Sequence, residues 1–147
     1  MKGSRPIIIG VFFLLLSSLF APAEGALTYD TIPLSASISD IAVSPGSDIA
    51  YGIDKESRTV FVFNIRNYTV IKEIQLTGIP NGITVNPKDS HALVTVSEAN
   101  QTGYLYLISP DGTIIDSILI ENDPQEIAVN PTRKTATCNF IKAIFTF

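Results

Sequence analysis

The stretch NGITVNPKDSHALVT, residues 81–95, has the pattern of a strand, a turn and a second strand. Closely similar stretches are SDIAVSPGSDIAYGI at 39–53 and QEIAVNPTRKTATCN at 125–139. A pattern that returns in the same form along one chain is the signature of a repeat architecture. The fold therefore follows from what one repeat contains and how far apart the copies stand.

The three copies align on a proline in their turn. These prolines, Pro45, Pro87 and Pro131, are 42 and 44 residues apart. In each copy an isoleucine stands four residues before the proline, a valine two before and an alanine five after. A further isoleucine stands 13 residues before each proline. A period of 40–45 residues made of short strands is typical of a propeller blade.

Each complete repeat contains four segments with the character of strands. The stretch after residues 39 and 81 alternates apolar with polar or small residues, as a strand does. TVFVFNI (59–65) and GYLYLIS (103–109) are apolar on both faces, as expected of a strand between neighbouring sheets. VIKEIQL (70–76) and IIDSILI (114–120) alternate more loosely, which suits an outer strand. We therefore predict an all-β fold of four-stranded antiparallel blades.

The pattern resembles the YVTN-type β-propeller repeat of surface-layer and secreted proteins and of lactonase-like propellers. The resemblance covers essentially residues 24–147 and is carried by IPNGITVNPKDSHALVT with GYLYLISPDGTIIDSILI, and by ISDIAVSPGSDIAYGID with TVFVFNIRNYTVIKEIQL. The third copy departs from it at ATCNFIKAIFTF (136–147). The resemblance implies a propeller fold and says little about function, because the matched positions are core and turn positions.

The predicted order of parts is an outer strand at 28–35, repeats at 39–76 and 81–120, and a partial repeat at 125–147. This is about three blades' worth of strands, whereas propellers have four to eight blades. Three alternatives follow: an incomplete ring that is a fragment of a longer propeller, a homodimer that closes a six-bladed ring, or an open arc docked on another chain. An N-terminal outer strand often completes the last blade of a closed propeller.

The N-terminus has the composition of a secretory signal. Two basic residues precede an apolar run from Ile7 to Phe20, which is followed by Ala21-Pro22-Ala23. We predict a signal peptide over 1–23, with an uncleaved anchor as the alternative. The remaining 124 residues would then be extracellular, on the cell surface or periplasmic, with no later membrane span.

Without residues 1–23 the chain has 8 basic against 14 acidic residues. Nucleic-acid binding requires a basic face, and no basic stripe with interleaved aromatic residues is present, so we expect no nucleic-acid partner. The single cysteine, Cys138, excludes an intrachain disulfide and is interpreted as a small buried residue, with an intermolecular disulfide or reactive thiol as the alternative. His91 is interpreted as a strand residue on a solvated face.

The loops that enter the innermost strands are expected to form one end of the central channel. Asp40, Asn81 and Gln125 are assigned there as equivalent residues of a polar ligand-binding ring, with capping of the strand backbone as the alternative. The loops 54–58 and 97–103 are expected at the same end. Asn67 and Asn100 begin Asn-x-Thr sequons and are candidate glycosylation sites.

No paired acid and base, no nucleophile beside a histidine and no metal-ligand cluster is evident, so no catalytic, cofactor or metal residue is predicted. Asp54, Glu56 and Glu98 are interpreted as solvated loop charges. Lactonase-like propellers use acidic or histidine residues around the channel, and no such set matches residue by residue. The predicted function is an exported or surface scaffold that binds a protein or a surface glycan. The alternative is a fragment of a lactonase-like or quinoprotein-like enzyme.

Overall fold

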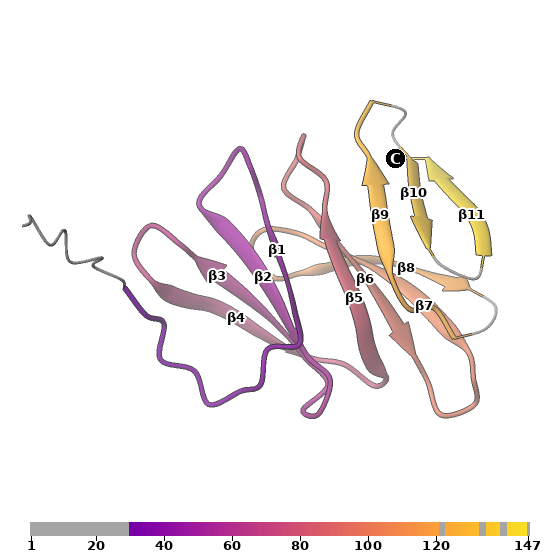
Figure 1. Cartoon of the computed structure of the whole chain (residues 1–147), viewed down its shortest axis with the longest axis horizontal. Coiled ribbons are helices and arrows are strands. Elements are labelled where there is room, and N and C mark those ends of the chain that lie inside the picture. The colour runs from indigo at the N-terminus through magenta and orange to yellow at the C-terminus, as the bar shows by residue number, and fades with distance from the viewer. Residues whose placement is uncertain (1–29, 121–122, 133–134, 139–140, 147) are drawn as a thin grey trace, which may run out of the picture. The chain divides into compact units, whose positions relative to one another are not determined.

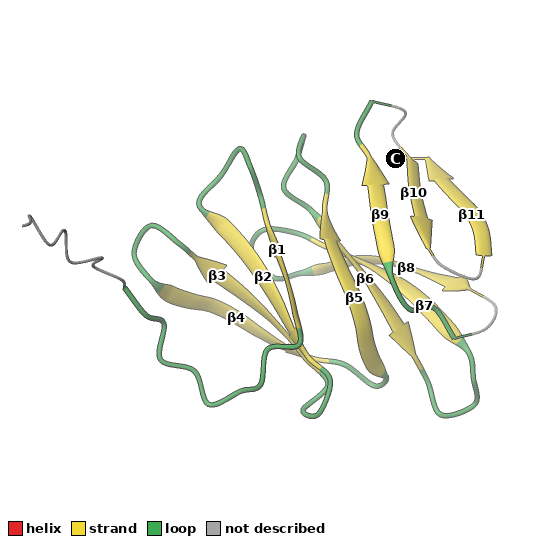
Figure 2. Ribbon diagram, in the orientation of Figure 1, coloured by secondary structure: helices red, strands yellow, loops and turns green. Residues whose placement is uncertain are grey.

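The structure is a computed structural model that describes residues 30–120, 123–132, 135–138 and 141–146, the last of these by its backbone alone. The predicted signal peptide, residues 1–23, lies outside the described residues. Figure 2 shows that the described chain consists of strands and loops. Among these residues no helix is long and apolar enough to cross a membrane.

Eleven strands are present in the described chain (Figure 1). The first repeat forms β1 (Asp40–Val43), β2 (Ile49–Asp54), β3 (Thr59–Asn64) and β4 (Thr69–Gln75). The second repeat forms β5 (Ile79–Val85), β6 (Ala92–Ser97), β7 (Gly103–Ile108) and β8 (Ile114–Ile120). The third repeat forms β9 (Ile127–Asn130), β10 (Thr135–Cys138) and β11 (Ile141–Thr146). The departure of the third copy from the repeat pattern therefore does not prevent strand formation.

Each repeat makes its own sheet, with strands in sequence order and every pair antiparallel. The first sheet is β1-β2-β3-β4, the second β5-β6-β7-β8, and the third contains β9, β10 and β11. The described chain thus forms two four-stranded blades of a β-propeller and three strands of a third, in a ring that it does not close. The predicted fold class is confirmed.

Each sheet has two faces that can be told apart by the innermost strand. The front face is defined as the one that carries the isoleucine and valine of the repeat: Ile41 and Val43, Ile83 and Val85, Ile127 and Val129. The back face carries the residues between and beside them, such as Ala42 and Tyr51. Because side chains alternate along a strand, one strand contributes to both faces.

The first two sheets pack back to front. The back face of the first sheet contributes Tyr51, Ile53, Val60 and Val62, and β4 and the residue after it contribute Ile74 and Leu76. These side chains pack with the front face of the second sheet, where Ile83, Val85, Val94 and Ile108 are buried. Burial of this apolar area is the main stabilising term between the two blades.

The same arrangement recurs between the second and third sheets. Leu93, Leu105 and Ile120 come from the second sheet, and Ala136 and Cys138 from the front face of the third. Ile127 and Val129 pack against this group. Two successive interfaces are therefore built from equivalent repeat positions, which explains why the apolar pattern is periodic over the whole described chain.

The front face of the first sheet is covered in part by residues 31–36. Ile32, Leu34 and Ala36 pack on a cluster of Ala50, Phe61 and Phe63. The predicted outer strand at 28–35 is not formed over 30–35, and residues 28 and 29 lie outside the described residues. A strand is stabilised by hydrogen bonds to a neighbour. Residues 31–36 have apolar packing, but no strand of the described residues pairs with them.

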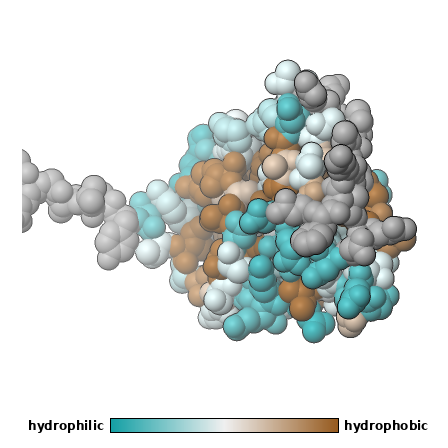
Figure 3. Space-filling model, turned by 45° about the vertical axis from the view of Figure 1, so that its right-hand side comes forward, coloured by the Kyte–Doolittle hydropathy of each residue, from teal (hydrophilic) through white to brown (hydrophobic). Residues whose placement is uncertain are grey.

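The two outermost sheet faces differ in character. On the front face of the first sheet Ile41 and Val43 are 59% and 53% exposed. On the back face of the third sheet Ala128, Asn130 and Thr137 are exposed. Only the first of these described surfaces is markedly apolar. Figure 3 shows that apolar patches interrupt the hydrophilic surface of the described residues.

Candidate functional site

A pocket of about 550 Å³ lies where the innermost strands of the three sheets begin. It is lined by nine residues of β1, β5, β9 and the adjoining loops: Ser39, Asp40, Lys55, Asn81, Gly82, Ile83, Gln125, Glu126 and Ile127. The three residues predicted for a polar ring, Asp40, Asn81 and Gln125, therefore line one pocket. Pockets of this size accept small molecules or the protruding groups of larger ones.

The three predicted ring residues are not equivalent in register, which corrects the sequence-based assignment. Asp40 pairs with Ile53, and Gly82 pairs with Thr95, which is the residue equivalent to Ile53. Counted from the repeat prolines, Asp40 therefore matches Gly82 and Glu126, and Ser39 matches Asn81 and Gln125.

Asn81 was predicted to lie in a loop, but it lies inside β5. The register shifts between Pro80 and Gly82, which leaves Asn81 unpaired at a β-bulge. A bulge adds one residue to one strand, so the side chain of the extra residue is redirected. The bulge brings the Asn81 side chain toward the third repeat. The periodic sequence pattern does not predict this bulge.

Asp40 links the first sheet to the second. Its Oδ1 accepts a hydrogen bond from the N–H of Ile41 at 2.9 Å, and its Oδ2 accepts one from the N–H of Ile83 at 3.1 Å. The capping interpretation of Asp40 is thus correct, and it extends to a backbone group of the next blade. Both carboxylate oxygens are engaged by backbone donors in this arrangement.

Asn81 makes the corresponding link from the second repeat to the third. Its Nδ2 donates to the Oγ of Ser97 at 2.5 Å and to the carbonyl of Pro124 at 2.8 Å. Ser97 in turn donates to a carboxylate oxygen of Asp123. The first role of Asp40 and Asn81 is therefore to fasten neighbouring sheets where the pocket begins.

Gly82 allows the two chain segments beside the pocket to approach closely. A Cβ atom at this position would lie 2.6 Å from the carbonyl oxygen of Gln125 and 3.2 Å from the Cα of Glu126. The buried hydroxyl of Thr95 accepts a hydrogen bond from the Gly82 N–H at 3.0 Å and donates to the Gln125 carbonyl at 2.8 Å. Thr95, which does not itself line the pocket, thus hydrogen-bonds to both of these segments.

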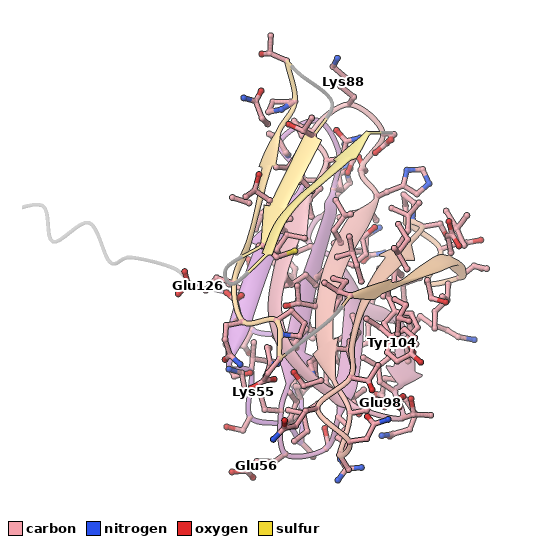
Figure 4. All side chains as sticks on the ribbon, turned by 90° about the vertical axis from the view of Figure 1, so that its right-hand side faces the viewer. Lys55, Glu56, Lys88, Glu98, Tyr104 and Glu126 are labelled. Carbon is pink, nitrogen blue, oxygen red and sulfur yellow. The ribbon has the colours of Figure 1, made fainter. Side chains whose placement is uncertain are left out.

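The remaining polar lining comes from Ser39, Lys55, Gln125 and Glu126. Lys55 and Glu126 are exposed, and Gln125 is half-buried. Figure 4 shows Lys55 at one end of the molecule and Lys88 at the other. A pocket with an ammonium group, a carboxylate and amides can donate and accept several hydrogen bonds to a polar ligand. Sequence reasoning named the loops of Lys55 and Glu126 but not these two side chains.

A second pocket of about 290 Å³ lies near the same end. Its lining includes Arg58, Thr77, Glu98, Gln101 and Asp123. Within it the hydroxyl of Thr77 donates to the Oε1 of Glu98 at 3.0 Å, and the guanidinium of Arg58 donates to the Thr77 carbonyl at 3.3 Å. These bonds connect the loop after β4 with the loops after β2 and β6.

Asp54 is a buried structural residue rather than the solvated loop charge predicted. It ends β2, is 4% exposed, and accepts hydrogen bonds from the N–H groups of Ser37, Glu56 and Ser57. Desolvation by burial acts to raise the pKa of the Asp54 carboxyl, but these hydrogen bonds outweigh it and lower the pKa below its usual value. Glu56, as predicted, is exposed.

Over the described ranges, no group of three or more histidine, cysteine, aspartate and glutamate side chains is placed to hold a metal ion. Cys138 is buried in the core between the second and third sheets, and burial raises the pKa of its thiol. His91 lies in the connection just before β6, and its Nδ1 is 3.0 Å from the Oδ1 of Asp89.

Both sequon asparagines are exposed residues of hairpin connections. Asn67 lies between β3 and β4, and its Oδ1 accepts a hydrogen bond from the hydroxyl of Thr69 at 2.7 Å. Asn100 lies between β6 and β7, and its Oδ1 accepts one from the N–H of Thr102 at 3.1 Å. Their positions are compatible with glycosylation, which stays a prediction.

A scan against protein-family models and a search of curated proteins gave no match to this chain. Among solved structures, the chain is similar to Kuenenia stuttgartiensis hydrazine synthase, with a TM-score of 0.59 and 20% sequence identity. The similarity covers 78% of this chain and 31% of that protein's chain. At this level of identity the likeness concerns the fold alone. The class of protein that fold and site define is a propeller-blade protein with a polar pocket between its inner strands.

Proposed function

We propose that this chain is an exported or cell-surface binding scaffold. In this proposal the pocket at the start of β1, β5 and β9 receives polar groups of a surface glycan or of a partner protein. The observation that carries the proposal is the convergence of three repeats on one pocket whose lining includes Lys55, Gln125 and Glu126. Export is inferred from the basic and apolar N-terminal sequence.

The chemistry of the pocket favours hydrogen bonding over apolar recognition. Six of its nine lining residues are polar or charged: Ser39, Asp40, Lys55, Asn81, Gln125 and Glu126. The pocket is also anchored, because Asp40 and Asn81 fix its walls through bonds between sheets. A preformed polar site loses little conformational entropy on binding, which raises the affinity that a few hydrogen bonds can provide.

The competing proposal is a part of a lactonase-like or quinoprotein-like enzyme. It would require catalytic groups to converge on the same pocket, and the described lining offers one ammonium group and two carboxylates without a shared reacting geometry. We therefore rank binding first.

The experiment uses the chain recovered after secretion, with its N-terminus determined by mass spectrometry. Binding of the fluorescently labelled chain to intact cells of the source organism is measured by flow cytometry. The site variants are Lys55→Glu and Gln125→Ala, which change exposed or half-buried lining without removing a bond between sheets. The matched control is Lys88→Glu, an exposed lysine at the opposite end (Figure 4).

We expect Lys55→Glu and Gln125→Ala, combined in one chain, to weaken binding to the cells at least about tenfold. The control Lys88→Glu should bind as the wild type does. Periodate treatment of the cells removes binding if the ligand is a glycan, and protease treatment removes it if the ligand is a protein. Equal binding by wild type and both site variants would show that the pocket is not the site. If the N-terminal residue of the secreted chain were Met1, cleavage near Ala23 would be excluded.

A further inference from the structure

The front face of the first sheet is largely exposed, whereas the equivalent faces of the second and third sheets are covered by the preceding sheet. Ile83 and Val85 are 7% and 9% exposed because the back face of the first sheet lies against them. Their equivalents Ile41 and Val43 are 59% and 53% exposed. The repeat therefore specifies what kind of surface would cover them, namely the back face of another sheet of this type.

One part of that missing sheet is already in place. Ile74 and Leu76, of β4 and the residue after it, pack on the front face of the second sheet. Their equivalents, 13 and 11 residues before the repeat proline, are Ile32 and Leu34. These pack in the corresponding way on Phe61 and Phe63 of the first sheet. Residues 31–34 thus take the position of an outermost strand, and the three inner strands of such a sheet are not among the strands of the described residues.

The backbone of this segment is suited to pairing. Residues 31–36 alternate between exposed and half-buried, as along a strand, although the chain bends at 35–36. In the described structure no backbone hydrogen bond joins 31–36 to another strand. An extended segment with unpaired backbone groups is a template for strand addition.

The third sheet is the complement of this arrangement. It contains the equivalents of β1, β2 and β3 and, in the described chain, no fourth strand beside β11. Its back face carries Ala128, the equivalent of Ala42, which packs against the apolar cluster between the first two sheets. Thr137 stands where the first sheet has Tyr51, so at this position the back face of the third sheet carries a smaller and more polar side chain than that of the first.

We propose that the front face of the first sheet binds the third sheet of a second copy of this chain, and that residues 31–34 add to that sheet as its fourth strand beside β11. Two such contacts, one in each direction, close a pair of chains into one ring, whereas the same head-to-tail interface without closure would give an open polymer. This inference is independent of the proposed ligand pocket.

The test is the native mass of the secreted chain, measured by light scattering over a range of concentrations. We expect a dimer that dissociates on dilution. The variant Ile41→Asp with Val43→Asp should raise the dissociation constant at least about a hundredfold, because two buried apolar contacts are lost at each interface. The matched control is Leu119→Asp, at a side chain that is 63% exposed on β8. Circular dichroism shows whether each variant keeps its β structure.

Hydrogen exchange tests the added strand directly. The amides of residues 31, 32 and 34 should be protected at concentrations where the dimer forms and exchange freely where it dissociates. A monomer at all concentrations, a larger polymer, or a dimer that the Ile41 and Val43 changes leave intact would overturn the proposal. A dimer without protection of these amides would overturn the strand addition.

Discussion

The Oδ2 of Asp40 accepts a hydrogen bond from the backbone N–H of Ile83, 43 residues away, at 3.1 Å. This single contact joins the innermost strands of two blades at the edge of the polar pocket. Asn81 makes the next link of the same kind, to the carbonyl of Pro124, which is also 43 residues away. Polar bonds thus join the first repeat to the second and the second to the third, although Asp40 and Asn81 are not equivalent repeat positions.

Replacement of Asp40 by alanine should lower the free energy of unfolding by about 1–2 kcal/mol, because the N–H groups of Ile41 and Ile83 lose their acceptor. The measurement is denaturant unfolding followed by circular dichroism. The control is Asp48→Ala, which removes an exposed ion pair with Arg66. Surface pairs of this kind contribute little, so the control should be close to neutral. Equal effects of the two changes would refute the bridging role of Asp40.

Replacement of Gly82 by alanine should destabilise the fold by about 1–3 kcal/mol, because its Cβ would lie 2.6 Å from the Gln125 carbonyl oxygen. Gly46→Ala is the matched control, since the nearest atom to its Cβ would be 3.9 Å away. Thermal unfolding of both variants checks the prediction. A neutral Gly82→Ala variant would mean that the segment before β9 does not pack on β5 as described.

Tyr51 is fully buried, and its hydroxyl donates to the carbonyl of Ser90 at 2.7 Å, in the loop between β5 and β6. Burial, with a smaller effect of the charges of Asp111 and Asp89, raises the pKa of its phenol, so the hydroxyl stays a donor. Tyr51→Phe should cost about 1–2 kcal/mol, because the carbonyl is left without this donor.

Thermal unfolding measures the effect of Tyr51→Phe. The control for this change is Tyr104→Phe, at a half-buried tyrosine whose hydroxyl has no hydrogen bond to a described residue. It should leave the unfolding temperature nearly unchanged. Loss of equal size in both variants would indicate that the missing hydroxyl acts through general solvation and not through the bond to Ser90.

Stability should fall in acid in a way that depends on Asp54. The pKa of its carboxyl is lower in the folded chain than the usual 3.8, so the ionised form stabilises the fold. This contribution is fully present above the unfolded-state pKa and is lost as the pH falls through the folded-state pKa. Unfolding temperatures measured from pH 6 to pH 2 should drop less steeply for Asp54→Asn than for the wild type. Parallel curves would contradict the assignment.

Cys138 should react slowly with a thiol reagent in the native chain and quickly in denaturant. The thiol is buried between two sheets, and burial raises its pKa, which disfavours the reactive thiolate. Absorbance of the released chromophore measures both rates. Rapid labelling of the native chain would restore the alternative of a reactive or intermolecular cysteine.

Much of the architecture could be predicted from the order of residue types. The repeat prolines and the isoleucines and valines at fixed distances from them gave the strands and their grouping into blades. These features are local, because alternation along a strand and turn chemistry act over a few residues. Asp40, Asn81 and Gln125 do line one pocket, although the repeat period makes Asp40 equivalent to Gly82 and Glu126 and not to Asn81 and Gln125.

The details of that pocket could not be predicted in this way. The β-bulge at Asn81, the close approach at Gly82 and the burial of Asp54 depend on contacts between segments that are distant in sequence. Asp54 and Glu56 look alike in the sequence as acidic residues of one loop. Only the N–H groups gathered around Asp54 make it a buried structural acid.

The sequence by itself determined the class of fold and the unit that repeats, because periodic apolar residues must be buried on one face of each strand. The tertiary structure decided which front face stays open and where residues 31–36 pack. Strand pairing needs a neighbour, and the presence of a neighbour is not a property of the segment. For that reason the sequence shows that Ile32 and Leu34 have the spacing of a strand. It does not show that they pack on the first sheet without a partner strand.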